Sequence, residues 1–185
     1  AKPGGGTKIG ATIAHPSITL RSDPADPRGP SRPFDGDGQP IGATTWIDRG
    51  VLRALECSRY WAQKQGATPV PTPGNFILEG TDAAPEELLR GIDRGVLVTR
   101  FWYNRIVEPR TILATGLTRD GTFLIEQGKV VKAVKNMRYN ESPVTMLGSV
   151  LAIGRAERVP IGGRVMVVPP LVVGGFNFSS LSDAV

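Results

Sequence analysis

The residues that most often carry out hydrolytic chemistry are scarce in this sequence. A catalytic zinc site needs about three His, Cys or carboxylate ligands and an open position for water. The chain has one histidine, His15, and one cysteine, Cys57, and it contains no HExxH, HExxxH or CxxC motif. A zinc site built by this chain alone would need several carboxylates, which zinc accepts less readily. We therefore predict no metal ligand and no catalytic residue in this chain.

A nucleophilic site would have to use His15 as its general base. Ser17, Cys57 and Asp35 could be assembled around it, but nothing in their spacing supports a triad. A hydrogen-bonded histidine and a small buried cysteine are the simpler interpretations. Asp35 and Asp37 alternate with glycines, which suits either Asx turns or a hard cation. Their spacing is too short for a calcium loop, so a structural turn is favoured.

Arginines beside aromatic residues form the most suggestive binding group. Phe101, Trp102 and Tyr103 lie between Arg100 and Arg105. Such a group could stack nucleobases. Strand alternation, however, would place Phe101 and Tyr103 on one face and Trp102 on the other, which favours a core or a subunit interface.

The elements that would position these residues are mostly hairpins. The sequence Asp48-Arg49-Gly50 predicts a tight turn within a hairpin over 44–56. Residues 22–40 hold five prolines and predict a long loop. Further strands are predicted at 17–21, 76–79, 96–103, 110–117, 122–126, 129–136, 165–168, 171–173 and 176–178, with hairpin turns at 119–121 and 126–128.

Three short helices are marked by their capping residues. The first is predicted from Ser58 to Gln65, with Gly66 ending it. The second begins at Pro85 and ends at Gly95, and the third begins at Ser142-Pro143 and ends at Gly154. Hairpins with about three short helices predict an α+β fold built mainly on antiparallel sheet.

Charge and composition narrow the function classes. The net charge of +5 and the pI near 9.7 favour anionic partners. Lys and Arg nevertheless form no run of five or more, so ordinary surface charge is the simpler interpretation and nucleic acid is disfavoured. A single cysteine excludes an intrachain disulfide and suits a reducing cytoplasm. No apolar run could cross a bilayer and no signal peptide opens the chain, so we predict a cytoplasmic protein without a membrane partner.

Several motifs in fixed order resemble the TldD/PmbA family. They are FDGDGQP at 34–40, WIDRGVL at 46–52, residues 75–80 followed by EELL at 86–89, GVLV at 95–98, FLIEQGK at 123–129 and VKN at 134–136. The stretches RFWYNR, GLTRDGTFLIE, NMRYNESP and FNFSSLSDAV are similar to a TldD-related branch. The resemblance runs from about residue 8 to the end of the chain.

The resemblance implies the C-terminal region of a zinc peptidase-like protein. In zinc-bearing members it implies two His from an upstream HExxxH helix, whose Glu is the general base, and a Cys from the C-terminal part. Residues 155–165, where that Cys is expected, contain none. The resemblance therefore implies zinc only in a full assembly. It also implies a homodimer or heterodimer with a TldD/PmbA-type subunit around a channel that admits flexible peptides.

These inferences define the expected organisation and two functional hypotheses. We expect a flexible start at 1–8 and one TldD/PmbA-type C-terminal domain at 9–185, lacking the N-terminal domain and the HExxxH segment. In the first hypothesis, this domain forms a dimer interface and the wall of a peptide channel in proteolysis. In the alternative, the chain is a metal-free structural or regulatory partner subunit with no catalysis of its own.

Three arginines are the candidate substrate-binding residues. Arg100, Arg105 and Arg119 are basic side chains set in predicted strands or at their ends, where they could receive peptide carboxylates or carbonyls. Salt pairs on an ordinary surface would explain the same pattern.

Overall fold

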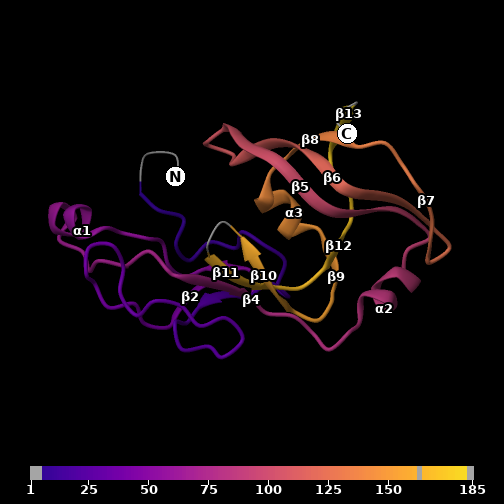
Figure 1. The fold of residues 1–185 in the computed structure, drawn as a ribbon. Coiled ribbons are helices and arrows are strands. Elements are labelled where there is room, and N and C mark those ends of the chain that lie inside the picture. Colours follow the sequence, from indigo (N-terminus) through magenta and orange to yellow (C-terminus); the bar gives the residue numbers. More distant parts are fainter. Residues whose placement is uncertain (1–5, 162–163, 183–185) are drawn as a thin grey trace. The chain divides into compact units, whose positions relative to one another are not determined.

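The structure is a computed structural model of the 185-residue chain that describes residues 6–161 and 164–182 (Figure 1). The chain divides into two compact units. Unit 1 comprises residues 1–82 and 155–170, and unit 2 comprises residues 83–154 and 171–185. Most of the predicted flexible start, 1–8, lies outside the described residues, and residues 6–8 have no regular secondary structure.

Unit 1 is built on a mixed sheet. Its elements are β1 (Leu20–Ser22), β2 (Thr44–Asp48), β3 (Val51–Leu52), α1 (Arg59–Gln65), β4 (Asn75–Leu78), β10 (Glu157–Ile161) and β11 (Arg164–Val168). The strand order is β10-β11-β4-β1-β2-β3, and the pair β11–β4 is parallel while the others are antiparallel. The strand β10 was not predicted from the sequence. The sheet therefore joins strands from both segments of unit 1.

The predicted turn at 48–50 is confirmed. Arg49 and Gly50 have φ of 46° and 82° between β2 and β3, the backbone of a two-residue hairpin turn. Gly50 also passes so close to residue 14 that an added Cβ would lie 2.4 Å from the Ala14 carbonyl oxygen. The arm after the turn is shorter than predicted, since β3 spans only Val51–Leu52.

The loop between β1 and β2 is ordered by buried polar side chains. Asn75 is 1% exposed; its Nδ2 donates to the carbonyls of Asp23 and Gly29, both at 2.6 Å, and its Oδ1 accepts from the Asp23 amide. Asp26 is also buried and accepts hydrogen bonds from Arg21 and Arg28. The Pro-rich segment is thus a fixed loop, as the sequence predicted.

Unit 2 is dominated by one antiparallel sheet. Its elements are α2 (Pro85–Arg90), β5 (Arg94–Glu108), β6 (Leu113–Glu126), β7 (Lys129–Ala133), β8 (Met137–Glu141), α3 (Pro143–Gly148), β9 (Val150–Ile153), β12 (Leu171–Val173) and β13 (Phe178–Leu181). The sheet order is β13-β8-β6-β5, with β7 also paired to β6, and β9 pairs separately with β12. The α+β class, built mainly on antiparallel sheet with three short helices among the described residues, is confirmed.

Several predicted boundaries in unit 2 are wrong. Residues 119–121 are not a hairpin turn but lie inside β6, where Asp120 and Gly121 have φ of 60° and 145° and bend a continuous strand. The strands predicted at 110–117 and 122–126 therefore form one strand, β6, and the reversal between β5 and β6 lies at 109–112. The turn at Gln127-Gly128 is confirmed, and β8 was not among the predicted strands.

The helices agree with the sequence better at their starts than at their ends. Ser58 caps α1 and Gly66 ends it in the left-handed region, as predicted. The second helix ends at Gly91 rather than Gly95, because the chain enters β5 at Arg94. The third helix stops at Gly148, and residues 150–153 form β9, since pairing with β12 overrides the apolar helical spacing.

Candidate functional site

The three predicted arginines lie on one face of the unit 2 sheet. Directly opposed residues of neighbouring strands point to the same face. Arg100 lies opposite Arg119, and Arg105 lies opposite Thr115, two residues from Leu117 on the same strand. Leu117 in turn lies opposite Trp102. We call this surface the arginine face, defined by Arg100, Trp102, Arg105 and Arg119.

Two of these arginines gather around one indole ring. The guanidinium carbon of Arg100 lies 4.4 Å from the Trp102 ring centroid, and that of Arg119 lies 5.6 Å from it. Asp120 pairs with both, at 2.7 Å from Arg100 Nη1 and 3.6 Å from Arg119 Nε. Cation–π contact and ion pairing together orient the two guanidinium groups. Arg105 has no such contact with them and lies farther along β5.

A bulge in β5 places the side chains of Arg105 and Trp102 on the same face of the sheet. Three residue steps from Trp102 to Arg105 oppose two steps on β6, from Leu117 to Thr115. Tyr103 lies in this bulge with φ of 54° and is 63% exposed. It packs edge-on against Trp102 at 5.6 Å rather than beside Phe101. The predicted sharing of a face by Phe101 and Tyr103 is therefore wrong, because the bulge breaks the strand alternation.

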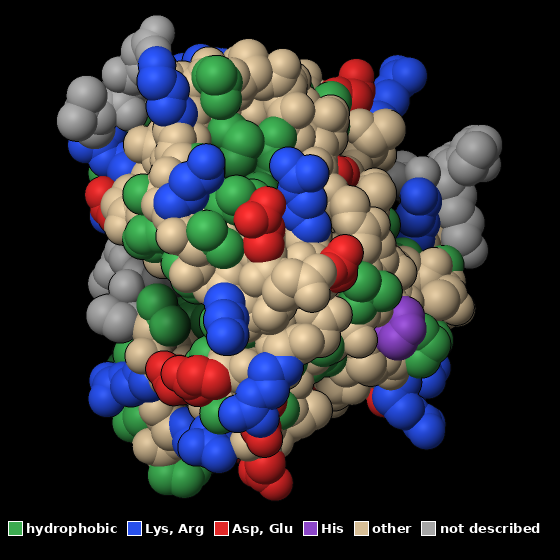
Figure 2. Space-filling view, turned by 90° about the vertical axis from the view of Figure 1, so that its right-hand side faces the viewer, with side chains coloured by type: hydrophobic (Ala, Val, Ile, Leu, Met, Phe, Trp, Pro, Cys, Tyr) green, Lys and Arg blue, Asp and Glu red, His purple; other side chains and the backbone are tan. Residues whose placement is uncertain are grey.

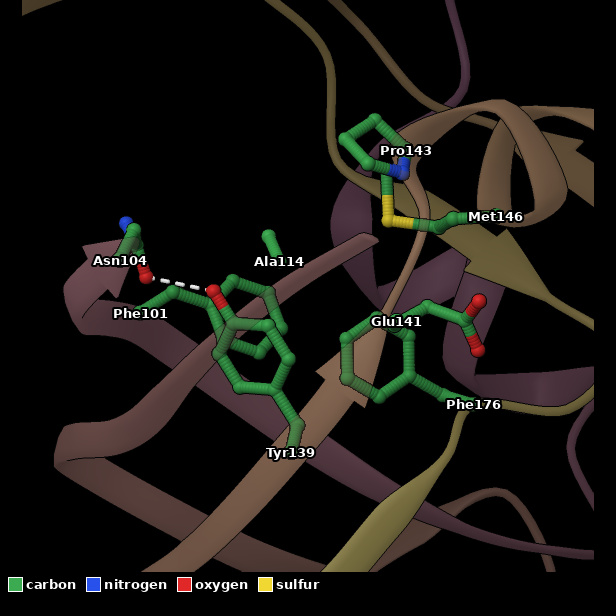
Figure 3. A pocket seen from close by; sticks show the side chains of 8 residues that line it. All are labelled: Phe101, Asn104, Ala114, Tyr139, Glu141, Pro143, Met146 and Phe176. Atoms are coloured by element: carbon green, nitrogen blue, oxygen red, sulfur yellow. Dashed lines mark hydrogen bonds between the residues drawn. The ribbon is translucent and has the colours of Figure 1, made fainter. Parts of the chain in front are cut away.

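The opposite face of the same sheet carries a small hollow, which we call the aromatic pocket (Figure 3). Its volume is about 170 Å³. The lining residues come from β5, β6, β8, α3 and the segment before β13: Phe101, Asn104, Ala114, Tyr139, Glu141, Pro143, Met146 and Phe176. Phe101 is 37% exposed, so the hollow reaches the surface.

The rings of the aromatic pocket pack on one another. Phe101 and Phe176 stack at a centroid distance of 5.3 Å, and Tyr139 packs edge-on against Phe101 at 5.0 Å. Gly116 lies opposite Tyr139, and a Cβ there would meet the Tyr139 hydroxyl and Asn104 Oδ1 at 2.7 Å. A glycine at this position of β6 therefore leaves room for the Tyr139 ring.

Three polar side chains complete the aromatic pocket. The Tyr139 hydroxyl donates to Asn104 Oδ1 at 2.5 Å, and burial raises the pKa of that hydroxyl. Glu141 accepts from the amides of Ser142 at 2.8 Å and Asn177 at 3.1 Å. These contacts fix the carboxylate and amide groups before any ligand arrives.

Sequence reasoning did not find the aromatic pocket. Tyr139, Glu141 and Phe176 fall in the stretches NMRYNESP and FNFSSLSDAV, which were used for the family resemblance, the start of the third helix and a strand at 176–178, but not as candidate binding residues. The spacing of two residues between Tyr139 and Glu141 could have indicated the pocket, because it places both side chains on one face of a strand. That signal required β8 to be recognised as a strand.

Of the residues considered for nucleophilic or metal chemistry, His15 and Ser17 lie within hydrogen-bond distance, whereas Cys57 and Asp35 contact other residues. His15 is exposed, visible in purple in Figure 2, and its Nδ1 lies 2.7 Å from Ser17 Oγ. Cys57 is half-buried rather than buried, and its backbone pairs with Val70. Asp35 Oδ1 accepts from the amides of Asp37 and Gln39, both at 2.9 Å, which is the predicted structural turn.

The described part of the chain offers no zinc ligand set. Within residues 6–161 and 164–182, no three His, Cys, Asp or Glu side chains come together in a way that could hold a metal ion. The donors among these described residues therefore do not fit the catalytic zinc that the family resemblance implies. What the unit 2 sheet offers is binding chemistry: oriented guanidinium groups on one face and a polar-ended aromatic pocket on the other.

A comparison with protein families identifies the group to which this fold belongs. The model for the PmbA/TldA metallopeptidase C-terminal domain matches residues 5–180. The chain belongs to the TldD/PmbA family. The expectation drawn from the short motifs is thereby confirmed for nearly the whole chain.

Relatives of the TldD/PmbA type are longer than this chain. A Methanothermobacter thermautotrophicus protein named as a metalloprotease is 25% identical over 167 residues, which cover 84% of this chain and 36% of that protein. A Bacteroides thetaiotaomicron protein named as a candidate modulator of DNA gyrase has a TM-score of 0.81 at 28% identity, covering 95% of this chain and 39% of that one. The chain thus spans about two-fifths of these relatives.

TldE from Thermococcus kodakarensis shares the fold. It matches with a TM-score of 0.76 at 22% identity, covering 89% of this chain and 40% of that chain. At this identity the likeness establishes the architecture alone.

Two observations concern nucleic acid and membranes as partners. On the face shown in Figure 2, Lys and Arg side chains are scattered among Asp and Glu side chains. A nucleic-acid interface would instead gather basic side chains into a patch or stripe. None of the helices in the described ranges is long and apolar enough to cross a membrane.

Proposed function

We propose that this chain is the C-terminal domain of a TldD/PmbA-type peptidase-related protein, where it binds an extended peptide and forms part of the wall of the peptide channel. Family membership supports the peptidase-related class. The observation that carries the binding role is the combination of an open strand edge with the arginine face on β5. This domain would hold the peptide, and the hydrolytic centre would belong to another part of the protein or to a partner.

The edge of β5 is suited to pairing with an extended chain. β5 has 15 residues and, among the described strands, pairs only with β6. Its other edge therefore presents backbone N–H and C=O groups to which a peptide strand can add. Ile106 and Val107 are 52% and 54% exposed beside this edge. An extended peptide or a subunit would cover them.

The arginine face supplies charge complementarity for such a peptide. Among the described residues, Asp120 is the one carboxylate that pairs with Arg100 and Arg119, so the group around Trp102 keeps a net positive charge. Guanidinium groups bind carboxylates and carbonyl oxygens through several donors at once. Arg105 extends the same face along β5 and would contact a neighbouring residue of the peptide.

The channel would be completed by another subunit. We propose a homodimer or a heterodimer with a second TldD/PmbA-type chain, with zinc carried by the full assembly. Intact mass and metal content of the native assembly test this part. Zinc together with a longer or additional chain is expected, whereas a metal-free assembly of this chain alone would favour the structural or regulatory role.

The peptide-binding role is tested by replacing the three arginines together. In the full-length protein, R100A/R105A/R119A should weaken binding of a fluorescein-labelled decapeptide of Gly, Ala and Ser at least tenfold, measured by fluorescence anisotropy. The loss should be smaller for a C-terminally amidated decapeptide, which lacks the one carboxylate of the peptide and leaves only its carbonyl oxygens for the arginines to bind.

A matched control removes the same charge elsewhere. Arg49, Arg53 and Arg59 are exposed arginines of unit 1, and R49A/R53A/R59A should leave the affinity within about twofold. Equal affinity for the wild type and R100A/R105A/R119A would refute the role of the arginine face. No peptide binding by any form, with subunit association that does not depend on salt, would favour the metal-free structural or regulatory partner.

A further inference from the structure

We infer that the aromatic pocket is a specificity site for one lysine or arginine side chain of the bound peptide, with the cationic end at Glu141. This inference rests on the proposed peptide-binding function and names the class of residue that the peptide would carry. It concerns the face of the sheet opposite the arginine face.

The size of the aromatic pocket suits one side chain. Its volume is about 170 Å³. A dry protein cavity of about 150 Å³ accommodates one benzene molecule. A single long side chain therefore fills the hollow, and two neighbouring residues of a peptide would not fit together.

The walls of the aromatic pocket favour a long side chain with an apolar stem. Phe101, Tyr139 and Phe176 supply three rings, and Met146 adds a polarisable thioether from α3. Lysine and arginine bury their methylene stems against such surfaces while keeping the charged end polar. A cation beside aromatic rings is also attracted by their negative faces.

The charge of the lining selects a positive ligand over a neutral one. Glu141 is the only ionisable carboxylate among the eight lining residues, and none of those residues is Lys or Arg. Each of its two oxygens accepts one backbone amide, from Ser142 or Asn177. A carboxylate has roughly four acceptor sites. About half of that capacity therefore remains for a ligand, on a carboxylate that is already held in place.

Asn104 provides a second polar group for the peptide backbone. Its Oδ1 accepts from the Tyr139 hydroxyl, and its Nδ2 donates to no other residue among those described. Figure 3 shows Asn104 at one end of the group and the Glu141 carboxylate beyond the Phe176 ring at the other. A peptide carbonyl at Asn104 and a cationic side-chain end at Glu141 would use both polar groups.

The test compares decapeptides that differ only at one central residue. The full-length protein is titrated calorimetrically with Gly/Ala/Ser decapeptides containing lysine, norleucine or glutamate. Lysine should bind about tenfold more tightly than norleucine, which has a similar stem without charge, and glutamate should bind most weakly. This ratio is measured on the wild-type protein and does not depend on a variant that folds.

Variants then assign the preference to the aromatic pocket. Glu141→Gln should make the lysine and norleucine decapeptides bind with equal affinity. Glu86→Gln, which changes an exposed glutamate of α2, should preserve the preference for lysine. Phe176→Leu should weaken lysine and norleucine peptides alike, because it removes part of the apolar wall. Thermal unfolding verifies that each variant is folded.

The outcomes separate this inference from the proposed function. Equal binding of lysine and norleucine peptides, or a lysine preference that survives Glu141→Gln in folded protein, overturns the assignment of the aromatic pocket. Peptide binding that still depends on Arg100, Arg105 and Arg119 would in that case leave the proposed function standing. Absence of binding by every decapeptide overturns both.

Discussion

At the scale of single residues, Asp26 shows how charge holds the long loop of unit 1. Its carboxylate is 6% exposed and accepts from Arg21 Nη2 at 2.5 Å and from Arg28 Nε and Nη2 at 3.1 and 3.0 Å. Arg21 and Arg28 also pair with Glu79, which follows β4. The cluster therefore ties the start of the loop to the strand beside it.

Removing the charge of Asp26 should destabilise the protein. Asp26→Asn replaces the buried carboxylate of two arginines by a neutral amide with one acceptor oxygen, and we expect a loss of about 2–3 kcal/mol in the free energy of unfolding. Urea denaturation followed by tryptophan fluorescence measures it. Asp48→Asn is the matched control, because Asp48 is 35% exposed and pairs with Arg53 at the surface. Its expected loss is below about 1 kcal/mol, and equal losses would contradict the role of burial.

The same carboxyl predicts how stability depends on pH. Hydrogen bonds from Arg28 and Arg21 hold the pKa of Asp26 well below its ordinary value of 3.8. The unfolded chain therefore binds this proton first, so the stabilisation is complete above about pH 5 and is lost as the pH falls further. The difference in unfolding free energy between wild type and Asp26→Asn should shrink between pH 5 and pH 2. A constant difference over that range would show that the charge is not its source.

At the scale of elements, the sequence predicted those features that local chemistry decides. Ser58 and Gly66 bound α1, and Arg49-Gly50 and Gln127-Gly128 turn their hairpins as expected. The failures share a different cause. Residues 150–153 carry a helical pattern but pair with β12, whose residues lie 18 to 23 positions later in the sequence, and only tertiary structure decides between the two states.

The candidate site also contains residues that the sequence singled out and residues that only strand pairing brings together. The arginines were found because charged side chains in a strand pattern are visible in the sequence. The bulge at Tyr103 and the strand β8 were not, because both depend on pairing with β6. The aromatic pocket is assembled from residues between Phe101 and Phe176, and no local pattern joins positions so far apart.

The hairpin of β2 and β3 should be sensitive to its turn glycine. Gly50→Ala places a Cβ 2.4 Å from the Ala14 carbonyl oxygen at a φ of 82°, so we expect a loss of about 2 kcal/mol or more in unfolding free energy. Gly36→Ala is the control, since a Cβ there meets nothing within 4 Å. It should change stability by less than about 0.5 kcal/mol. Thermal melts followed by circular dichroism compare the two, and similar values would argue against strain at the turn.

At the scale of the whole molecule, the chain crosses between its two units three times. Unit 1 needs residues 155–170, because β11 pairs with β4 inside its sheet. Cutting the chain at one position therefore cannot release an intact unit. Each unit is specified by segments that are distant in sequence.

A fragment experiment tests this interdependence. Residues 1–82 alone should lack a cooperative unfolding transition, because β4 keeps β1 but loses β11, its other partner strand. The buried side chain of Ile77 then loses its contact with the paired residue Val167 and becomes exposed to water. Supplying 155–170 through a short Gly/Ser linker should restore the transition in urea denaturation. Cooperative unfolding of 1–82 without that segment would show that β10 and β11 are dispensable.

The bulge at Tyr103 is one extra residue in β5, because three residue steps from Trp102 to Arg105 oppose two steps on β6. Losing one amino acid at the bulge would therefore leave a regular strand in which Arg105 still lies opposite Thr115, on the arginine face. Losing one amino acid from a regular stretch of β5, such as residues 94–98, would instead turn the side chains on one side of the deletion over to the other face of the sheet. We expect homologues to vary in length at the bulge of β5 and to keep the length of its regular stretches.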